Sequence, residues 1–160
     1  MVLNNAVNSS NPVMQVLSTS TTAVVTCNTT IPADNSIPQQ STEGTEVFTL
    51  AITPKSTTSI LVITFAGCIT CDSTAVSVGI ALFQDSTANA LSAKHIAIGT
   101  TESTTGTLQH IMTAGTTSST TFKIKVGGNA STVYVNGNSA GTRLMGGVSS
   151  TTLTIVEYLA

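Results

Sequence analysis

Apolar and polar residues alternate with a period of two along most of this chain, and this pattern constrains the fold more than any other feature. In the clearest case, apolar residues at positions 122, 124 and 126 alternate with Lys123 and Lys125. Because successive side chains of a strand point to opposite faces of a sheet, this segment predicts a strand with one solvated face. The same pattern predicts about 8–10 short strands, in the ranges 14–17, 23–26, 47–52, 60–65, 76–83, 95–98, 108–112, 122–126, 133–135 and 153–158.

Turn-forming residues separate these expected strands at short intervals, and no stretch shows a convincing helical period. Asn136 and Gly137, for example, tolerate the positive φ angles that tight hairpins need. The chain is therefore predicted to be all-β, an antiparallel β-sandwich of the jelly-roll kind. Near the C-terminus the apolar set shifts from Ile155 to Val156, and a β-bulge there would reconcile the pattern.

The length favours one domain with a single hydrophobic core. Residues 1–12 are rich in Asn and Ser and end at Pro12, which predicts an N-terminal arm followed by one β-sandwich domain over 13–160. The segment 31–41 contains Pro32 and Pro38, so we expect an extended loop there rather than a paired strand.

Charged residues are unusually scarce. The chain of 160 residues has five Lys or Arg and seven Asp or Glu, whereas 50 residues are Ser or Thr. A surface wetted by hydroxyl groups removes the usual electrostatic barrier between subunits, which predicts a protein that forms assemblies. A net charge of −2 gives no basic footprint for nucleic acid. No apolar run reaches the roughly 18–20 residues that span a bilayer, so we expect neither a nucleic-acid nor a membrane partner.

Three cysteines, Cys27, Cys68 and Cys71, are an odd number in a chain without the features of a secretory signal. We therefore expect free thiols in a reducing compartment. Cys68 and Cys71 have the spacing of a redox pair or half a zinc site. The sequence shows neither the other two zinc ligands nor a following helix, so both residues are interpreted as small apolar side chains at a strand end.

No catalytic constellation stands out. His95 and His110 are the two histidines, and a Ser–His–Asp triad can be written from many of the serines, but no Gly-x-Ser-x-Gly motif is present. The glycines of 141–147 lack the strand-to-helix context of a phosphate-binding loop. We expect no enzymatic activity, no metal site and no cofactor.

A resemblance to a known class of proteins is carried by four segments, 31–44, 53–56, 81–91 and 132–138. In these phrases, and in style over residues 13–160, the chain resembles the small β-sandwich modules of tailed-bacteriophage virions. Such modules occur as the tips of tail fibres and as trimeric decoration or cement proteins on capsids. The resemblance implies a jelly roll and a homotrimer.

These observations lead to one hypothesis about function. We expect a homotrimeric capsid decoration or cement protein, made in the cytoplasm of a bacterial host and located in the virion. Its partners would be copies of itself and the major capsid protein or another virion protein. We expect Val2, Leu3, Val13 and Met14 to contribute to the contacts of this assembly.

Two alternatives from other classes remain. One is a tail-fibre or spike tip that binds a host receptor or glycan, with a shallow site on the loops that carry His95, His110, Tyr134 and Arg143. The other is an enzyme such as a polysaccharide depolymerase, which the scarcity of charged residues disfavours. Binding to host cells or glycans, or turnover of a polysaccharide, would distinguish them.

Overall fold

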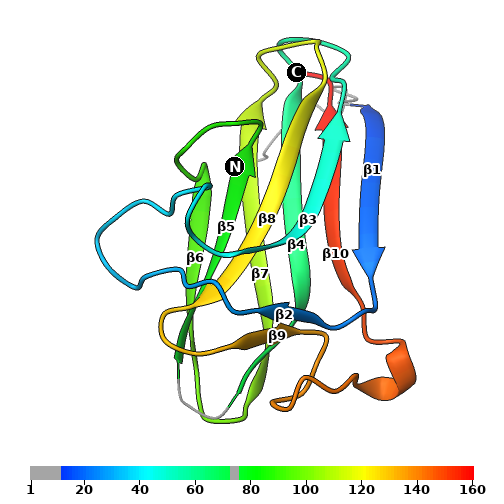
Figure 1. Cartoon of the computed structure of the whole chain (residues 1–160). Helices are drawn as coiled ribbons and strands as arrows, with labels where there is room; N and C mark the ends of the chain where they lie inside the picture. The colour runs from blue at the N-terminus through cyan, green and yellow to red at the C-terminus, as the bar shows by residue number, and fades with distance from the viewer. Residues whose placement is uncertain (1–11, 73–75) are drawn as a thin grey trace, which may run out of the picture.

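The computed structural model describes residues 12–72 and 76–160, and these residues form two antiparallel β-sheets packed face to face (Figure 1). The only helical element in these ranges is a single 3₁₀ turn, Met145–Gly147. The strands are β1 (Val13–Thr21), β2 (Val25–Cys27), β3 (Thr45–Ile52), β4 (Ile60–Cys71), β5 (Val76–Gln84), β6 (Ser92–Ile98), β7 (Ser103–Thr113), β8 (Thr120–Gly128), β9 (Val133–Val135) and β10 (Thr151–Tyr158). The predicted all-β sandwich of the jelly-roll kind is confirmed.

The larger sheet is organised around the long strand β4. One edge of β4 pairs first with β10 and then, near its end, with β9, while the other edge pairs with β7 along almost its whole length. Strand β1 pairs with β10 and β2 pairs with β9. The smaller sheet has the order β3-β8-β5-β6, so β6 is an edge strand of this sheet, and β7 lies beyond β4 in the larger one.

The main core lies between the two sheets and is built from the alternate residues that the sequence pattern singled out. Ile124 and Val126 of β8, for instance, are fully buried, and Phe48 packs edge-on against Phe65 with ring centroids 6.3 Å apart. Aliphatic side chains fill most of the remaining volume, which explains how a chain with 4% aromatic residues closes a sandwich.

The outer face of the smaller sheet is partly covered by the chain itself. The connection between β2 and β3 crosses this face, and its Ile31 forms a second, smaller apolar cluster with Ala81 and Phe83. Lys125 donates hydrogen bonds to the backbone oxygens of Gln40 (2.5 Å) and Glu43 (3.0 Å) in the same connection. The predicted solvated face is therefore wrong in part, because Lys123 and Lys125 are half-buried beneath this segment.

The β-bulge expected near the C-terminus does not exist. Strand β10 alternates regularly from Thr151 to Tyr158, and Glu157 occupies an inward position where the pattern called for an apolar residue. Its carboxylate is buried and accepts hydrogen bonds from the Gln15 side chain (2.5 Å) and the Lys55 backbone N–H (2.7 Å). A register irregularity lies instead in β1, between Val13 and Gln15.

Candidate assembly interface

No segment that the structure describes lies over the outer face of the larger sheet. The composition of this face follows from the strand register. Cross-strand partners on β1, β10, β4 and β7 align in rows, so that Val16, Val156, Val62 and Ile111 are neighbours across four strands. The row above joins Val13, Tyr158, Ile60 and Thr113, and the row below joins Ser18, Thr154, Thr64 and Gln109. None of these outward positions carries a charge.

This face has two halves of different chemistry. We call the half nearer to Pro12 the apolar patch, and it consists of Val13, Val16, Ile60, Val62, Ile111, Val156 and Tyr158. The other half presents hydroxyl and amide groups from residues such as Thr64, Thr107 and Thr154. Val13, Val16 and Ile111 are 49%, 58% and 59% exposed, so the patch offers apolar side chains to solvent or to a partner.

The apolar patch exists because four neighbouring strands place β-branched residues outward in register. Isolated exposed apolar residues are ordinary on protein surfaces, but contiguous patches mark interaction sites. In many antiparallel sheets, the solvated face of a strand carries Lys or Glu, which also protects it from pairing with other chains. The outward positions of β1, β10, β4 and β7 lack such charges, so this face can pack on another surface without desolvating an ion.

The structure locates two of the four predicted contact residues. Val13 lies at the upper corner of the apolar patch, opposite Tyr158. Met14 is half-buried, and its sulfur accepts a hydrogen bond from the Ser59 hydroxyl at 3.6 Å. Val2 and Leu3 lie outside the described residues. Sequence reasoning missed Val16, Val62 and Ile111, because only the register reveals that their strands are neighbours.

The four residues proposed for a receptor site do not come together. His95 lies on β6, on the outer side of the smaller sheet, whereas His110 is half-buried on β7, opposite Ile63. Tyr134 and Arg143 lie at the far end of the sandwich, in and after β9. A single shallow site built from all four is therefore not what the fold provides.

The thiols and carboxylates do not form a reactive centre in the described part of the chain. Cys27 and Cys71 are buried, and Cys68 is half-buried on the outer face of the larger sheet, beside Thr105. Burial raises the pKa of the Cys27 thiol to about 12, which keeps it protonated and unreactive at neutral pH. Within the described ranges no three His, Cys, Asp or Glu residues gather as metal ligands, and no helix is long and apolar enough to cross a membrane.

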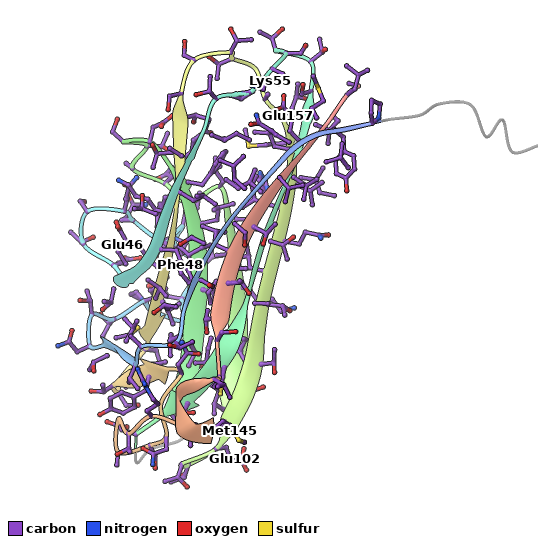
Figure 2. All side chains as sticks on the ribbon, turned by 90° about the vertical axis from the view of Figure 1, so that its right-hand side faces the viewer. Glu46, Phe48, Lys55, Glu102, Met145 and Glu157 are labelled. Atoms are coloured by element: carbon purple, nitrogen blue, oxygen red, sulfur yellow. The ribbon has the colours of Figure 1, made fainter. Side chains whose placement is uncertain are left out.

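Among the residues that the structure describes, Glu157 is the only charged side chain that is fully buried, and it lies near this face. Burial opposes ionisation, but hydrogen bonds from Ser59, Gln15 and the backbone of Lys55 and Ser56 outweigh it and lower the pKa of Glu157. Figure 2 shows Glu157 and Lys55 at the same end of the sandwich, away from Met145. Glu157 thus ties the β3–β4 connection to β1 and β10, and holds the end of the apolar patch in place.

The fold defines a class of protein, an antiparallel β-sandwich domain, here with exposed apolar residues on the outer face of the larger sheet. A family model described as the Pgp3 C-terminal domain matches residues 13–160. The chain belongs to this family. No curated protein sequence matches the chain.

Several solved structures share the course of the chain at low identity. A structure of infectious bursal disease virus, Gt strain, is 12% identical over 92% of this chain and 39% of its own, with a TM-score of 0.42. A structure of the Gx strain is 11% identical over 92% of this chain and 39% of its own, with a TM-score of 0.40. The enzymatically active domain of bacteriophage CBA120 tailspike protein 4 is 14% identical over 76% of this chain and 18% of its own, with a TM-score of 0.28. The chain thus spans 39% of the matched chain in each of these two infectious bursal disease virus structures, and similarity at this level says nothing about function.

Proposed function

We propose that this chain is a structural protein of a bacteriophage virion, a homotrimeric capsid decoration or cement protein that stabilises the shell by non-covalent contacts. The observation that carries self-association is the uncharged outer face of the larger sheet, with the apolar patch at one end. The place in a virion is supported by the resemblance of the sequence to phage β-sandwich modules. The protein would be made in the cytoplasm of the bacterial host.

The chemistry of the face favours another copy of the same chain as its partner. In a closed ring of identical subunits the same contact is repeated at every interface, so a patch present on one subunit serves all three contacts of a trimer. Removing the exposed part of each Val or Ile side chain from water contributes on the order of 1 kcal/mol. Several such residues per subunit, with no ion to desolvate, support a stable assembly.

Sedimentation equilibrium on the full chain tests the oligomer directly, and we expect a trimer at micromolar concentration. A thiol-reactive reagent tests the face, because Cys68 lies on it while Cys27 and Cys71 are buried in the subunit. We expect slow labelling of Cys68 in the assembled protein and faster labelling on dilution below the dissociation constant. A monomer at all concentrations, with Cys68 equally reactive throughout, would refute self-association.

Attachment to the shell is tested separately. We expect a variant lacking residues 1–12 to remain a trimer but to lose binding to purified capsids, because the arm is predicted to bridge neighbouring capsid subunits. Retained binding would remove the arm from the proposal. Immunogold labelling of intact particles locates the protein on the shell or on the tail, and labelling of the tail would favour the fibre-tip alternative.

A further inference from the structure

Two adjacent hollows lie on either side of the edge strand β6. One, of about 290 Å³, lies on the outer side of the smaller sheet and is walled by residues of the β2–β3 connection, among them Asp34 and Pro38. The other, of about 480 Å³, lies between β6 and the outer face of the larger sheet, where Thr64 of β4 and Gln109 of β7 line it. Ala93 and Lys94 line both hollows, which we together call the β6 groove. Each hollow is near the lower end of the roughly 300–1,000 Å³ typical of sites for small ligands.

The hollow between β6 and β7 offers one cation among neutral polar groups. Lys94 pairs with the buried Ile80 across the sheet, so its side chain leaves the strand on the side that faces β7. Ser92, Thr107 and Gln109 line the same hollow. Lys94 has no ion-pair or hydrogen-bond partner among the residues that the structure describes. An exposed lysine among hydroxyl and amide groups suits a ligand that carries both a carboxylate and hydroxyl groups.

The other hollow offers an oriented acceptor. The Oδ1 atom of Asp34 accepts hydrogen bonds from the Ser36 backbone N–H (2.7 Å) and hydroxyl (2.5 Å). These two bonds, the hydroxyl first, lower the pKa of Asp34, so the carboxylate stays ionised in mild acid. Within the described ranges, Oδ2 accepts no hydrogen bond and is available to a hydroxyl donor. His95 and apolar atoms of Pro32 and Pro38 complete the wall.

The wall of this hollow is held in place before any ligand arrives. The Ala90 backbone N–H donates to the oxygen of Pro38 (3.0 Å), and the Gln39 side chain donates to Asn89 (2.8 Å). Lys125 holds the end of the same connection from below. A wall fixed by several bonds loses little conformational entropy on binding, which favours recognition of a small ligand.

From this arrangement we infer that the β6 groove binds an acidic saccharide, a sugar unit bearing a carboxylate within a longer glycan. Lys94 pairs with the carboxylate, Ser92, Thr107 and Gln109 bond to hydroxyl groups of that unit, and Asp34 accepts from a hydroxyl of the next unit across β6. No Phe, Tyr or Trp ring lines the groove, so a single site binds weakly, with a dissociation constant in the millimolar range. Thr107 and Gln109 project from the outer face of the larger sheet, so assembly through that face competes with the sugar, and the dissociated subunit presents the open groove.

Saturation-transfer NMR tests the site on the full chain carrying Val62→Asp, which is expected to dissociate the oligomer, as the background for every groove variant. Glucuronic acid and N-acetylneuraminic acid are the probes, and glucose and N-acetylglucosamine are their neutral counterparts. We expect transfer to the two acids and at least a ten-fold weaker effect on the neutral sugars. Lys94→Gln should abolish transfer to the acids, and Asp34→Asn should weaken it for a disaccharide more than for a monosaccharide. Lys55→Gln, an exposed lysine at the end of the sandwich near Glu157, is the matched control and should leave binding unchanged.

Three results would overturn the inference. One is equal transfer to acidic and neutral sugars, and another is equal transfer with and without Lys94→Gln in the Val62→Asp background. Equal transfer to acetate would show that Lys94 attracts any carboxylate and that the groove recognises no sugar. Failure here is distinguishable from failure of self-association, because Lys94→Gln should sediment as the wild type does. Binding should be stronger in the dissociated Val62→Asp variant than in the assembled wild type, since assembly through the outer face of the larger sheet covers Thr107 and Gln109.

Discussion

The two outer faces of the sandwich follow the same alternation in sequence but meet different fates in the fold. The smaller sheet carries Lys123 and Lys125 outward, and the β2–β3 connection lies over them and contributes Ile31 to an apolar cluster. The larger sheet carries no charge on the outward positions of its four long strands, and its apolar patch remains exposed. The same alternation thus leaves outward apolar side chains covered by the chain itself on one face and exposed on the other.

The largest effect should come from a charge at the centre of the apolar patch. Val62→Asp would leave an unpaired carboxylate in the proposed interface, at a cost of about 3–5 kcal/mol. We expect the dissociation constant of the oligomer to rise more than 100-fold in sedimentation, and Cys68 to become rapidly labelled.

The other face supplies the matched control for this variant. Thr49→Asp introduces the same charge at an exposed position of β3, opposite Lys123 on the smaller sheet, and should leave the oligomer intact. Equal dissociation of both variants would show that the uncharged face has no special part in assembly. Circular dichroism verifies that each variant keeps its β structure.

A substitution on the covered outer face of the smaller sheet should reduce the stability of the subunit and leave assembly unchanged. Ile31 is 4% exposed, and Ile31→Ala would leave a cavity above Ala81 and Phe83 at a cost of about 2–5 kcal/mol. We expect the midpoint of urea unfolding to be lower for Ile31→Ala than for wild type and Val62→Asp. The three proteins are compared at a concentration low enough for all of them to be monomers. An unchanged midpoint would mean that the β2–β3 connection adds little to the stability of the fold.

A smaller effect, dependent on pH, is expected from Glu157, which lies inside the sandwich beneath the apolar patch. Because its folded pKa is lowered, Glu157 stabilises the fold above its unfolded pKa of about 4.3, and this contribution is lost as pH falls through the folded value. Glu157→Gln should therefore be less stable than wild type at pH 7 by roughly 1–3 kcal/mol. The difference should shrink between about pH 5 and pH 3 in urea unfolding curves. A difference that is constant over this range would exclude ionisation as the cause.

The smallest effect is expected from the segment that covers the smaller sheet. Gln40→Ala removes the side-chain oxygen that accepts from Lys123 at 2.8 Å and the side-chain amide that donates to the Thr87 oxygen at 2.6 Å, but keeps the backbone oxygen that accepts from Lys125. Neither lost bond is fully buried, so each contributes toward the lower end of about 0.5–1.5 kcal/mol. We expect a modest increase in the rate of proteolysis within 31–40 and no change in sedimentation. A change in oligomer size would contradict the assignment of assembly to the other face.

Much of the fold could be predicted because alternation is a local property. The alternation around Phe122, Leu61 and Leu153 predicts a strand in each case without reference to any other part of the chain. The bulge predicted near Val156 failed for a physical reason, since the inward position of Glu157 is satisfied by Gln15 and by the backbone of Lys55, which lie far away in sequence. A pattern of apolar residues cannot predict a buried carboxylate whose hydrogen-bond partners come from other parts of the chain.

The candidate interface was predicted only in its chemistry. The scarcity of charged residues predicted a surface suited to contact with other subunits. The assembly contacts expected of Val13 and Met14 remain a prediction. Val2 and Leu3 lie outside the described ranges. Which face is free depends on the pairing of β1, β10, β4 and β7, and on the path of the β2–β3 connection. Neither is written in any local window of sequence.

By itself, the sequence determined that this chain forms short strands with one side buried and that its surface is wetted mainly by hydroxyl groups. Only the tertiary structure decided that Val16, Val62, Val156 and Ile111 form one row, that Lys123 and Lys125 lie beneath a connection, and that Lys94 stands in a groove beside β7. The physical reason is the separation along the sequence over which each effect acts. Side-chain alternation is fixed within a few residues, whereas the neighbours of a strand are set by hydrogen-bonded register between segments up to a hundred or more residues apart.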